Sequence, residues 1–407
     1  MRVFLSAGEP SGDHHAALLV AALRRRAPDV ECVGFGGPHL AVAGCTLVAD
    51  LTRLAVMWFL RVIVNIHRFV DLARRAERSF LDRRPDVCVL VDFPGFHWWL
   101  AWRARRHGIP VVFYCPPQIW AWASWRIGKM RRLVDLVLSA LPFEHEWFLS
   151  QGMPSTYVGH PFFDEVATGA RLWPTTDRPL IVLLPGSRGQ EVADNLDTIL
   201  RAAGRIQDDV PEARFVVATL HERHARLARE ALASTPGLRA EVEAGRARQL
   251  IAEARAAIAV SGSVSLELLA SRVPTVIVYR IGGLAHVVQS WFRHARFITL
   301  VNLLAAADPI GPVRPTWRPP RGVPPSDPEA VFPEYLSVED PAALVAADVT
   351  RWLRDEAAYR GVVDRLETLA AGVVRGGSAD RAAAAVLALA AGRDPVVVAP
   401  APAADAA

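Results

Sequence analysis

The chain has 407 residues, of which 52% are hydrophobic and 22% charged, so it is long enough for two domains and for a large apolar core. This composition excludes a fully disordered chain. The net charge of +4 comes almost entirely from arginines, since Lys129 is the only lysine, and these arginines are scattered along expected helices. Such scattering is typical of solvated helix faces, so we expect no nucleic-acid binding.

The cysteines and the apolar segments indicate a cytoplasmic chain. The four cysteines have no CxxC spacing and are expected to be free thiols in a reducing compartment. No basic segment precedes an apolar one at the start of the chain, so no signal peptide is expected. The most apolar segment, 54–66, is interrupted by Arg61 and is shorter than the roughly 20 residues that a spanning helix needs. We therefore expect no membrane-spanning helix.

Short apolar runs alternate with helical patterns in the first half of the chain. The runs are continuous in Val, Ile and Leu, which is typical of parallel strands buried on both faces. Helices are expected between them, among them 13–26, which ends in three arginines, and 54–81. The expected strands are 2–8, 29–37, 85–95, 109–117, 134–142 and 155–161.

The same pattern restarts after a proline-containing linker at 168–179. Further strands are expected at 180–184, 213–220, 256–262 and 273–280. These patterns predict an α/β chain with two Rossmann-like domains facing each other across a cleft. The predicted parts are an N-terminal domain at 1–167, a second domain at 178–338 that includes a proline-rich exposed loop at 308–333, C-terminal helices at 339–391 that pack back, and a disordered tail at 392–407.

In open α/β sheets, ligands bind at the carboxyl ends of the strands. Six loops occupy such positions here. They read GEPSGD (8–13), DFPGF (92–96), PPQIWAW (116–122), GHP (159–161), PGSRGQE (185–191) and SGSVSLE (261–267). Each motif alone is weak, but their common position at strand ends makes the set more specific.

Two of these loops suit a bound diphosphate. Gly186 and Gly189 let the backbone approach an anion, Ser187 offers a hydroxyl and Arg188 a guanidinium. No GK[ST] follows, so the loop is not a Walker A loop, and the alternative is a plain strand–helix turn. In the later loop, backbone N–H groups can face a diphosphate and Glu267 can accept from ribose hydroxyls. The residues that would present these N–H groups are Ser261, Gly262 and Ser263, and the alternative is that Ser263 simply caps a helix.

Asp92 is the candidate general base. It follows a buried strand, and a carboxylate at that position can remove the proton of an attacking hydroxyl. The alternative is a helix N-cap. His97 and His160 are further candidates, although single histidines are most often structural. No histidine group has enough neighbouring donors for a metal site, so no metal and no cofactor is expected.

The first loop, GEPSGDHH, is expected to line the cleft. Gly8 and Gly12 allow close approach of the backbone, whereas Glu9, Ser11 and Asp13 are polar contacts or caps.

Two apolar helical segments have a second interpretation beside that of core helices. The segments 54–81 and 279–297 are rich in large apolar residues and are fringed by arginines. Such surfaces can meet lipid chains and anionic headgroups.

Taken together, these residues resemble one family, the lipid A disaccharide synthases, which are two-domain GT-B glycosyltransferases. The matching motifs recur in family order over roughly residues 1–390. They are SAGEPSGD, LAVM, PDVCVLVDFPGF, YCPPQIWAW with Arg126, LVLSALPFE, YVGHPFFDE, LLPGSRGQEV, SGSVSLELL, PTVIVYR, VNLLA and FPEYL.

The resemblance implies an inverting transfer of 2,3-diacylglucosamine from its UDP derivative to 2,3-diacylglucosamine 1-phosphate, which gives a β(1→6) disaccharide and UDP. It implies that Asp92 matters for activity, that Arg188, Ser263, Glu267 and Tyr279 lie on the UDP side, and that further matching residues line the acceptor side or the cleft. Those further residues are Trp120, Trp122, Arg126, His160 and Asn302. It also implies peripheral attachment to the inner face of the inner membrane, and dimerisation is a family expectation.

Several positions depart from the family pattern. Trp58 and Arg61 replace a usual glycine and glutamate, His97 replaces an asparagine, and 308–333 is an insertion. Three alternatives therefore stay open: a paralogue that uses a UDP-sugar with another lipid-linked acceptor, an inactive membrane-associated protein that binds a nucleotide sugar, and a nucleotide-sugar epimerase of similar build.

Overall fold

A computed structural model describes residues 1–52, 66–165, 178–311, 315–318 and 320–395. The chain divides into two compact units, which we describe separately. Unit 1 comprises Met1–Glu165 and Arg375–Ala407, and unit 2 comprises Val166–Val374. Trp58 and Arg61, and most of the linker expected at 168–179, lie outside the described residues.

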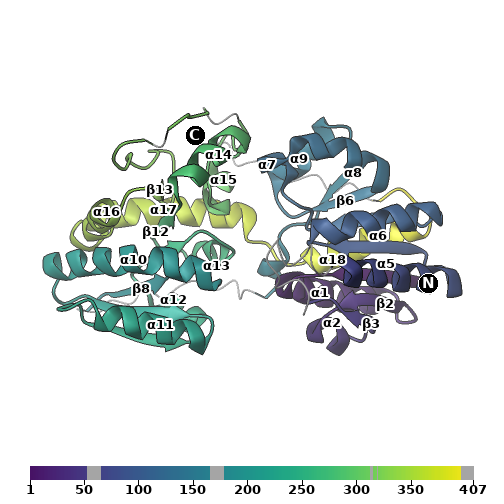
Figure 1. The fold of residues 1–407 in the computed structure, drawn as a ribbon, viewed down its shortest axis with the longest axis horizontal. Helices are drawn as coiled ribbons and strands as arrows, with labels where there is room; N and C mark the ends of the chain where they lie inside the picture. The colour runs from purple at the N-terminus through teal and green to yellow at the C-terminus, as the bar shows by residue number, and fades with distance from the viewer. Residues whose placement is uncertain (53–65, 166–177, 312–314, 319, 396–407) are drawn as a thin grey trace. The chain divides into compact units, whose positions relative to one another are not determined.

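Unit 1 is built on a sheet of seven parallel strands in the order β3-β2-β1-β4-β5-β6-β7 (Figure 1). The central strands are continuous apolar runs, and all five residues of β4 are buried. This is the composition expected of a parallel sheet with both faces covered. The strands are β1 (Arg2–Ala7), β2 (Glu31–Gly36), β3 (Thr46–Asp50), β4 (Val87–Val91), β5 (Val111–Tyr114), β6 (Leu136–Ser139) and β7 (Ser155–Tyr157).

Helices cover both faces of this sheet and make two apolar cores. One core joins α5, α6 and α8 to residues such as Phe4 and Phe113, and the other joins α1 and α18 to residues such as Leu5. The helices are α1 (Pro10–Arg26), α2 (Pro38–Val42), α5 (Ile66–Asp82), α6 (Pro94–Arg106), α7 (Ile119–Trp122), α8 (Ile127–Leu133), α9 (Pro142–Ser150) and α18 (Ser378–Ala390), with 3-10 turns η1 (Ser124–Arg126) and η2 (Pro161–Asp164).

The C-terminal helix α18 returns to unit 1 and packs on α1 (Figure 1). The carboxylate of Asp164 accepts hydrogen bonds from the first N–H groups of α18, those of Ser378 and Ala379, at 2.8 Å each. The Ser378 hydroxyl donates to the carbonyl of Gly159 at 2.6 Å. The helices expected at 339–391 are therefore shared between the units, since α16 (Ala342–Arg354) and α17 (Glu356–Val373) belong to unit 2.

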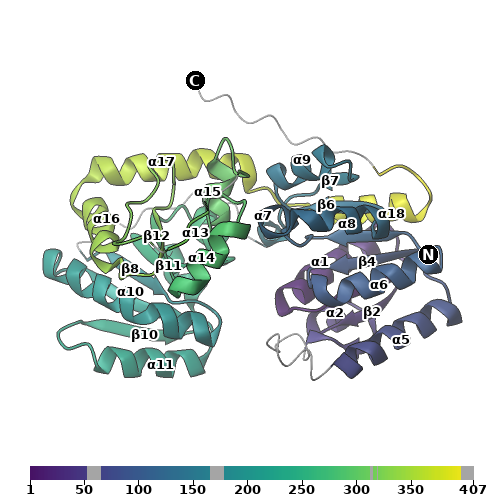
Figure 2. The ribbon, with the colours of Figure 1, turned by 45° about the horizontal axis from the view of Figure 1, so that its top comes forward.

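Unit 2 repeats the architecture with six parallel strands in the order β10-β9-β8-β11-β12-β13. Helix α16 packs on α10 over one face (Figure 2), while α12, α13 and α17 cover the other. The strands are β8 (Leu180–Leu184), β9 (Arg214–Thr219), β10 (Ala240–Ala244), β11 (Ala256–Val260), β12 (Thr275–Arg280) and β13 (Glu334–Ser337). The remaining helices are α10 (Gly189–Asp209), α11 (Glu222–Ala233), α12 (Ala247–Glu253), α13 (Val264–Ala270), α14 (Gly283–Phe292) and α15 (Leu300–Ala305).

Two further expectations concern the state of the cysteines and membrane-spanning helices. All four cysteines are free thiols. Within the described ranges, no helix combines the length and the hydropathy that crossing a bilayer requires.

Candidate functional site

Strand order brings three of the expected loops together in unit 1. Strands β1, β4 and β5 are neighbours and parallel, so the loops that follow them meet at one edge of the sheet. GEPSGD follows β1, DFPGF follows β4 and CPPQ follows β5. This edge is where the fold places ligands.

The backbone at this edge is strained. Four described non-glycine residues have a left-handed backbone, and three of them lie here: Asp92 at φ 55°, Phe93 at φ 47° and Cys115 at φ 50°. Each such residue costs about 1–3 kcal/mol and persists only where the surroundings enforce it, typically at functional sites. The N-cap of α6 is Phe93 rather than Asp92, and the Asp92 carboxylate accepts from the N–H of Phe93 at 2.9 Å.

His97 holds the Asp92 backbone in this conformation. The His97 side chain is fully buried, its Nδ1 donates to the carbonyl of Asp92 at 2.6 Å, and its Nε2 accepts from the hydroxyl of Ser6 on β1 at 2.9 Å. Burial lowers the pKa of His97 to about 3, so the ring is neutral at neutral pH. His97 therefore acts as a structural link between β1 and Asp92 rather than as a base.

The first loop packs against the same residues, and the packing requires a glycine at position 8. A Cβ on Gly8 would overlap the ring of Phe93, whereas one on Gly12 would lie at an ordinary van der Waals distance, 3.5 Å, from the Cβ of Asp92. Glu9 is the N-cap residue of α1, without a side-chain cap bond, and Ser11 is exposed. The loop therefore brings the start of α1 against Asp92.

Asp13 is engaged in a structural role. It is 1% exposed, and its carboxylate accepts from the N–H groups of Gly37 (2.6 Å), His39 (3.0 Å) and Leu40 (3.2 Å) at the start of α2. Of the two roles expected for Asp13, contact or cap, the structure shows the cap.

His160 belongs to a cluster of histidine rings. Its Nδ1 accepts from the N–H of Phe162, and its ring lies edge-on to His15 at 5.8 Å between centroids. Burial lowers the pKa of His160 to about 4 and, together with the neighbouring histidines, that of His15 to about 3. Across the described residues, no group of three His, Cys, Asp or Glu side chains is arranged to hold a metal ion.

The WAW motif divides into a buried and an exposed part. Trp120 is 1% exposed and donates from Nε1 to the buried carboxylate of Glu144 at 3.0 Å. Trp122 and Arg126 are exposed and available to a ligand. Burial raises the pKa of Glu144 to about 7.

Glu144 is a residue that the sequence analysis did not single out. Burial raises the pKa of the Cys115 thiol at the end of β5, and the charges of Asp92 and Glu144 add to this shift. In the sequence, Glu144 ends the PFE triplet (142–144) that follows β6, and this position after a strand could have indicated it.

In unit 2, the glycine-rich loop after β8 is organised by Glu191. Gly186 has φ 115°, and a Cβ there would lie 2.8 Å from the Cβ of Glu191, so the position requires glycine. The Glu191 carboxylate accepts from the N–H groups of Ser187 and Arg188 at 3.2 Å each and pairs with the Arg188 guanidinium at 3.0 Å. The side chain of Arg188 is nevertheless 75% exposed. The N–H groups of Ser187 and Arg188 are thus occupied, while the guanidinium of Arg188 is open to an anion.

The loop after β11 lies beside it, because β8 and β11 are neighbours. The Ser261 hydroxyl donates to the carbonyl of Ile298 at 2.8 Å, whereas Gly262 and Ser263 are exposed. Ser263 is the N-cap residue of α13 but makes no side-chain cap bond.

Two ionisable side chains complete this edge. Glu267 accepts from Nε of Arg248 at 3.3 Å, and burial raises its pKa. Burial and the charge of Glu191 raise the pKa of Tyr279, while Arg188 opposes the shift, so Tyr279 lies near the glycine-rich loop.

Asn302 is engaged within unit 2. It is 1% exposed, its amide donates to the carbonyl of Phe332 at 2.8 Å and to Glu334 at 3.0 Å, and its oxygen accepts from the N–H of Phe332 at 2.9 Å. These bonds tie α15 to the start of β13 and occupy both ends of the amide.

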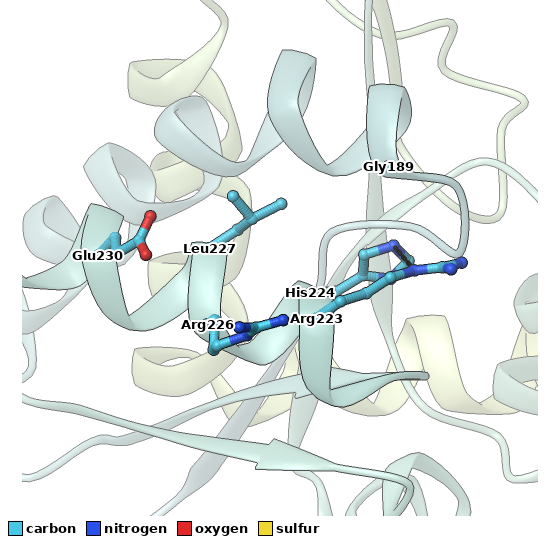
Figure 3. Close-up of a pocket in the computed structure, with 6 residues that line it drawn as sticks. All are labelled: Gly189, Arg223, His224, Arg226, Leu227 and Glu230. Carbon is cyan, nitrogen blue, oxygen red and sulfur yellow. Dashed lines mark hydrogen bonds between the residues drawn. The ribbon is translucent and has the colours of Figure 1, made fainter.

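A cavity of about 340 Å³ lies on the α11 side of the start of α10 (Figure 3). Inside it, Nε2 of His224 accepts from Nε of Arg223 at 3.2 Å. Of the six loops singled out from the sequence, one reaches this cavity, PGSRGQE through Gly189, and the mixed charges of the cavity select no ligand. The lining residues are Gly189, Arg223, His224, Arg226, Leu227 and Glu230.

Two parallel α/β units, each with its polar loops at the carboxyl edge, define a GT-B fold, as predicted. Solved structures of this kind are similar over nearly the whole chain. A UDP-GlcNAc 2-epimerase from Neisseria meningitidis has a TM-score of 0.58 at 10% identity and matches 95% of this chain and 99% of its own. MurG from Acinetobacter baumannii has a TM-score of 0.55 at 14% identity, with the same coverage of 95% and 99%. At such identities the likeness shows the fold alone.

Sequence relatives show the family. The model of the family described as lipid-A-disaccharide synthetase matches residues 3–311. The lipid-A-disaccharide synthase of Myxococcus xanthus (strain DK1622) is 33% identical over 398 residues, which cover 95% of this chain and 97% of that protein. Lipid-A-disaccharide synthase 1 of Legionella pneumophila (strain Philadelphia 1) is 34% identical over 315 residues, 75% of this chain and 81% of its own. The chain belongs to the lipid-A-disaccharide synthase family, and the resemblance noted in its sequence is confirmed.

Proposed function

We propose that the protein is an inverting glycosyltransferase that transfers 2,3-diacylglucosamine from UDP to 2,3-diacylglucosamine 1-phosphate. The products are a β(1→6)-linked disaccharide and UDP. The observation that carries the disaccharide synthase function is family membership over nearly the whole chain. It favours this reaction over another lipid acceptor or an inactive binding protein.

Asp92 is the proposed general base. In an inverting transfer the acceptor hydroxyl attacks the anomeric carbon from the face opposite to UDP, and its proton must pass to a base as the new bond forms. The Asp92 carboxylate stands at the carboxyl end of β4, on a strained backbone that His97 and Ser6 hold in place. A group held in this way loses little freedom when it meets the acceptor.

Arg188 is the proposed partner of the UDP diphosphate. Its guanidinium is exposed at the end of β8 and can make charge-assisted bonds to phosphate oxygens, which stabilises the negative charge that UDP carries away. Glu191 holds the same guanidinium, so a diphosphate competes with Glu191 for Arg188. Gly262, Ser263, Glu267 and Tyr279 are proposed to complete the UDP side.

An aromatic and basic surface of unit 1 supports attachment to the inner face of the inner membrane. Residues 93–134 contain six of the chain's 12 tryptophans and seven Lys or Arg residues but no Asp or Glu. Helices α6 and α8 lie side by side in both views (Figures 1 and 2). The short helix α7 and the turn η1 directly precede α8 in the chain. We give the name tryptophan–arginine surface to a set of exposed side chains from these four elements. It comprises Trp99, Trp102, Trp122, Trp125, Arg106, Arg126, Lys129, Arg131 and Arg132.

The composition of this surface matches a lipid headgroup layer. The guanidinium of Arg106 lies 4.8 Å from the ring centroid of Trp102, and the ammonium of Lys129 lies 5.2 Å from that of Trp98. Indole rings favour the membrane–water interface, and cations favour anionic headgroups. The two acylated glucosamine substrates are lipids, so a protein at that interface has direct access to them.

The test is to incubate the purified full-length protein with the UDP-linked donor and the 1-phosphate acceptor. We expect disaccharide and UDP in equal amounts. Release of UDP without disaccharide would point to another acceptor or to hydrolysis, and the absence of both products would contradict the proposal.

A further inference from the structure

Helix α14 of unit 2 leaves an apolar face open. Of its ten residues, all described, Ser290 alone is buried. The exposed fractions are 81% for Leu284, 49% for Val288, 42% for Trp291 and 50% for Phe292. The spacing of these residues, at i, i+4, i+7 and i+8, places them on one face of the helix.

Trp317, from the proline-rich segment, extends this face. Its ring lies 4.3 Å from that of Trp291, between centroids, and is 80% exposed. The segment is tied to the helix, because Trp291 donates from Nε1 to the carbonyl of Thr316 at 3.0 Å and the N–H of Thr316 donates to the Ser290 hydroxyl at 2.9 Å. The structure therefore presents the Trp317 ring to solvent on a fixed support.

The charges that flank this surface in the sequence are mostly positive. Residues 279–325 contain six arginines and one carboxylate, that of Asp308. Of these arginines, Arg296 is paired with Asp327 and Glu329. Arg318 and Arg321 follow Trp317 directly and are exposed. An exposed apolar face with such a fringe is complementary to the anionic phosphates and the acyl region of a phospholipid layer.

We propose that the α14–Trp317 surface, made of Leu284, Val288, Trp291, Phe292 and Trp317, binds a bilayer that contains anionic phospholipid. It would be a second lipid contact, on unit 2, in addition to the tryptophan–arginine surface of unit 1. The inference rests on the proposed function, because the proposed substrates are bilayer lipids. A ten-residue helix is about 15 Å long, half the thickness of the hydrocarbon core, so α14 lies in the interface rather than across it. Trp317 lies beyond the residues that match the family model, which end at 311.

The test is cosedimentation of the full-length protein with vesicles of phosphatidylcholine alone and of phosphatidylcholine with phosphatidylglycerol, without substrates. We expect Leu284→Ser and Trp317→Ala each to lower partitioning onto the phosphatidylglycerol vesicles by about tenfold. The matched control is Leu227→Ser, the same change at an exposed leucine of α11 in the same unit, and it should bind like the wild type. Circular dichroism and the melting temperature verify that all variants are folded.

Other outcomes would overturn the proposal. If Leu284→Ser and Trp317→Ala bind vesicles as the wild type does, the surface has no role at the bilayer. If they instead convert a dimer to a monomer, it covers a second copy of the chain, and if they only raise KM for long-chain donors, it holds substrate acyl chains. A wild-type protein that binds the vesicles through this surface but forms no disaccharide would refute the proposed function and leave this inference standing.

Discussion

At the carboxyl edge of the unit 1 sheet Asp92 is held from several sides, whereas at the corresponding edge of unit 2 Arg188 projects into solvent. The Asp92 backbone is left-handed and bonded to a fully buried His97, which is itself bonded to Ser6. Arg188 is 75% exposed and is held by the single carboxylate of Glu191.

The difference matches what the two edges must do. A proton transfer requires a base in a fixed position, and misplacement by 1 Å can cost about a hundredfold in rate. A diphosphate can instead be gripped by a long side chain that adjusts to it. We therefore expect substitutions in unit 1 to act on turnover and substitutions in unit 2 to act on donor binding.

Asp92→Asn should give the largest effect. The amide keeps the size of the side chain but cannot take up a proton, so kcat should fall by about 10²–10⁴-fold. Calorimetry should show UDP binding close to that of the wild type. Turnover within twofold of the wild type would remove Asp92 as the base.

His97→Leu should lower kcat by about ten- to a hundredfold, with little change in the KM for the donor. It leaves the Asp92 carbonyl and the Ser6 hydroxyl without their partner, so the strained backbone can relax. His97→Asn should restore most of the activity, because an amide can also donate and accept. Since the pKa of His97 is about 3, the pH profile from 6 to 8 should be the same in His97→Asn as in the wild type. If His97→Leu lowered only the amount of folded protein and left the kcat of the folded fraction unchanged, a positioning role would be refuted.

Arg188→Ala should raise the donor KM by about tenfold, the usual worth of one charge-assisted bond, and change kcat less. Glu191→Gln is the matched variant, because it weakens the hold on Arg188 and keeps the guanidinium. Its donor KM should stay level or fall. If both variants raise KM equally, the loop matters for its shape and not for the charge of Arg188.

Glu144→Gln should alter stability more than activity. Burial raises the pKa of Glu144 from 4.5 to about 7, so the folded protein binds this proton more tightly than the unfolded chain does. The resulting stabilisation is complete below pH 4.5 and is lost as the pH rises through 7, by an amount on the order of 3 kcal/mol. Urea unfolding from pH 4.5 to 8 should show this loss in the wild type relative to Glu144→Gln. If the free energy of unfolding changed with pH in the same way in both proteins, the raised pKa of Glu144 would be contradicted.

The central strands were predictable because their residues face apolar surroundings on both sides, as the five buried residues of β4 do. The strands β3, β10 and β13 were not predicted. All three lie at sheet edges and are only partly buried, as in the AEVEA sequence of β10. That C-terminal helices pack back was expected, and α18 does so. That it returns to unit 1 depends on bonds between Asp164 and Ser378, 214 residues apart, which no local pattern encodes.

The placement of the candidate residues at strand ends was predictable, whereas their hydrogen-bond partners were not. Asp92 and Arg188 lie at strand ends, as their motifs indicated. The structural engagements of Asp13, Trp120 and Asn302 depend on distant partners, namely Gly37, Glu144 and Phe332. The tryptophan–arginine surface was not predicted, because the distribution of arginines was considered over the whole chain. The feature that indicates the surface is local, namely that residues 93–134 contain no carboxylate.

The most direct test of the account counts both products in one sample. The full-length protein is incubated with the UDP-diacylglucosamine donor and the diacylglucosamine 1-phosphate acceptor, and UDP and disaccharide are quantified together over time. The account predicts one disaccharide for each UDP, and no UDP release when the acceptor is omitted. UDP release that does not depend on the acceptor, or that yields no disaccharide, would contradict it.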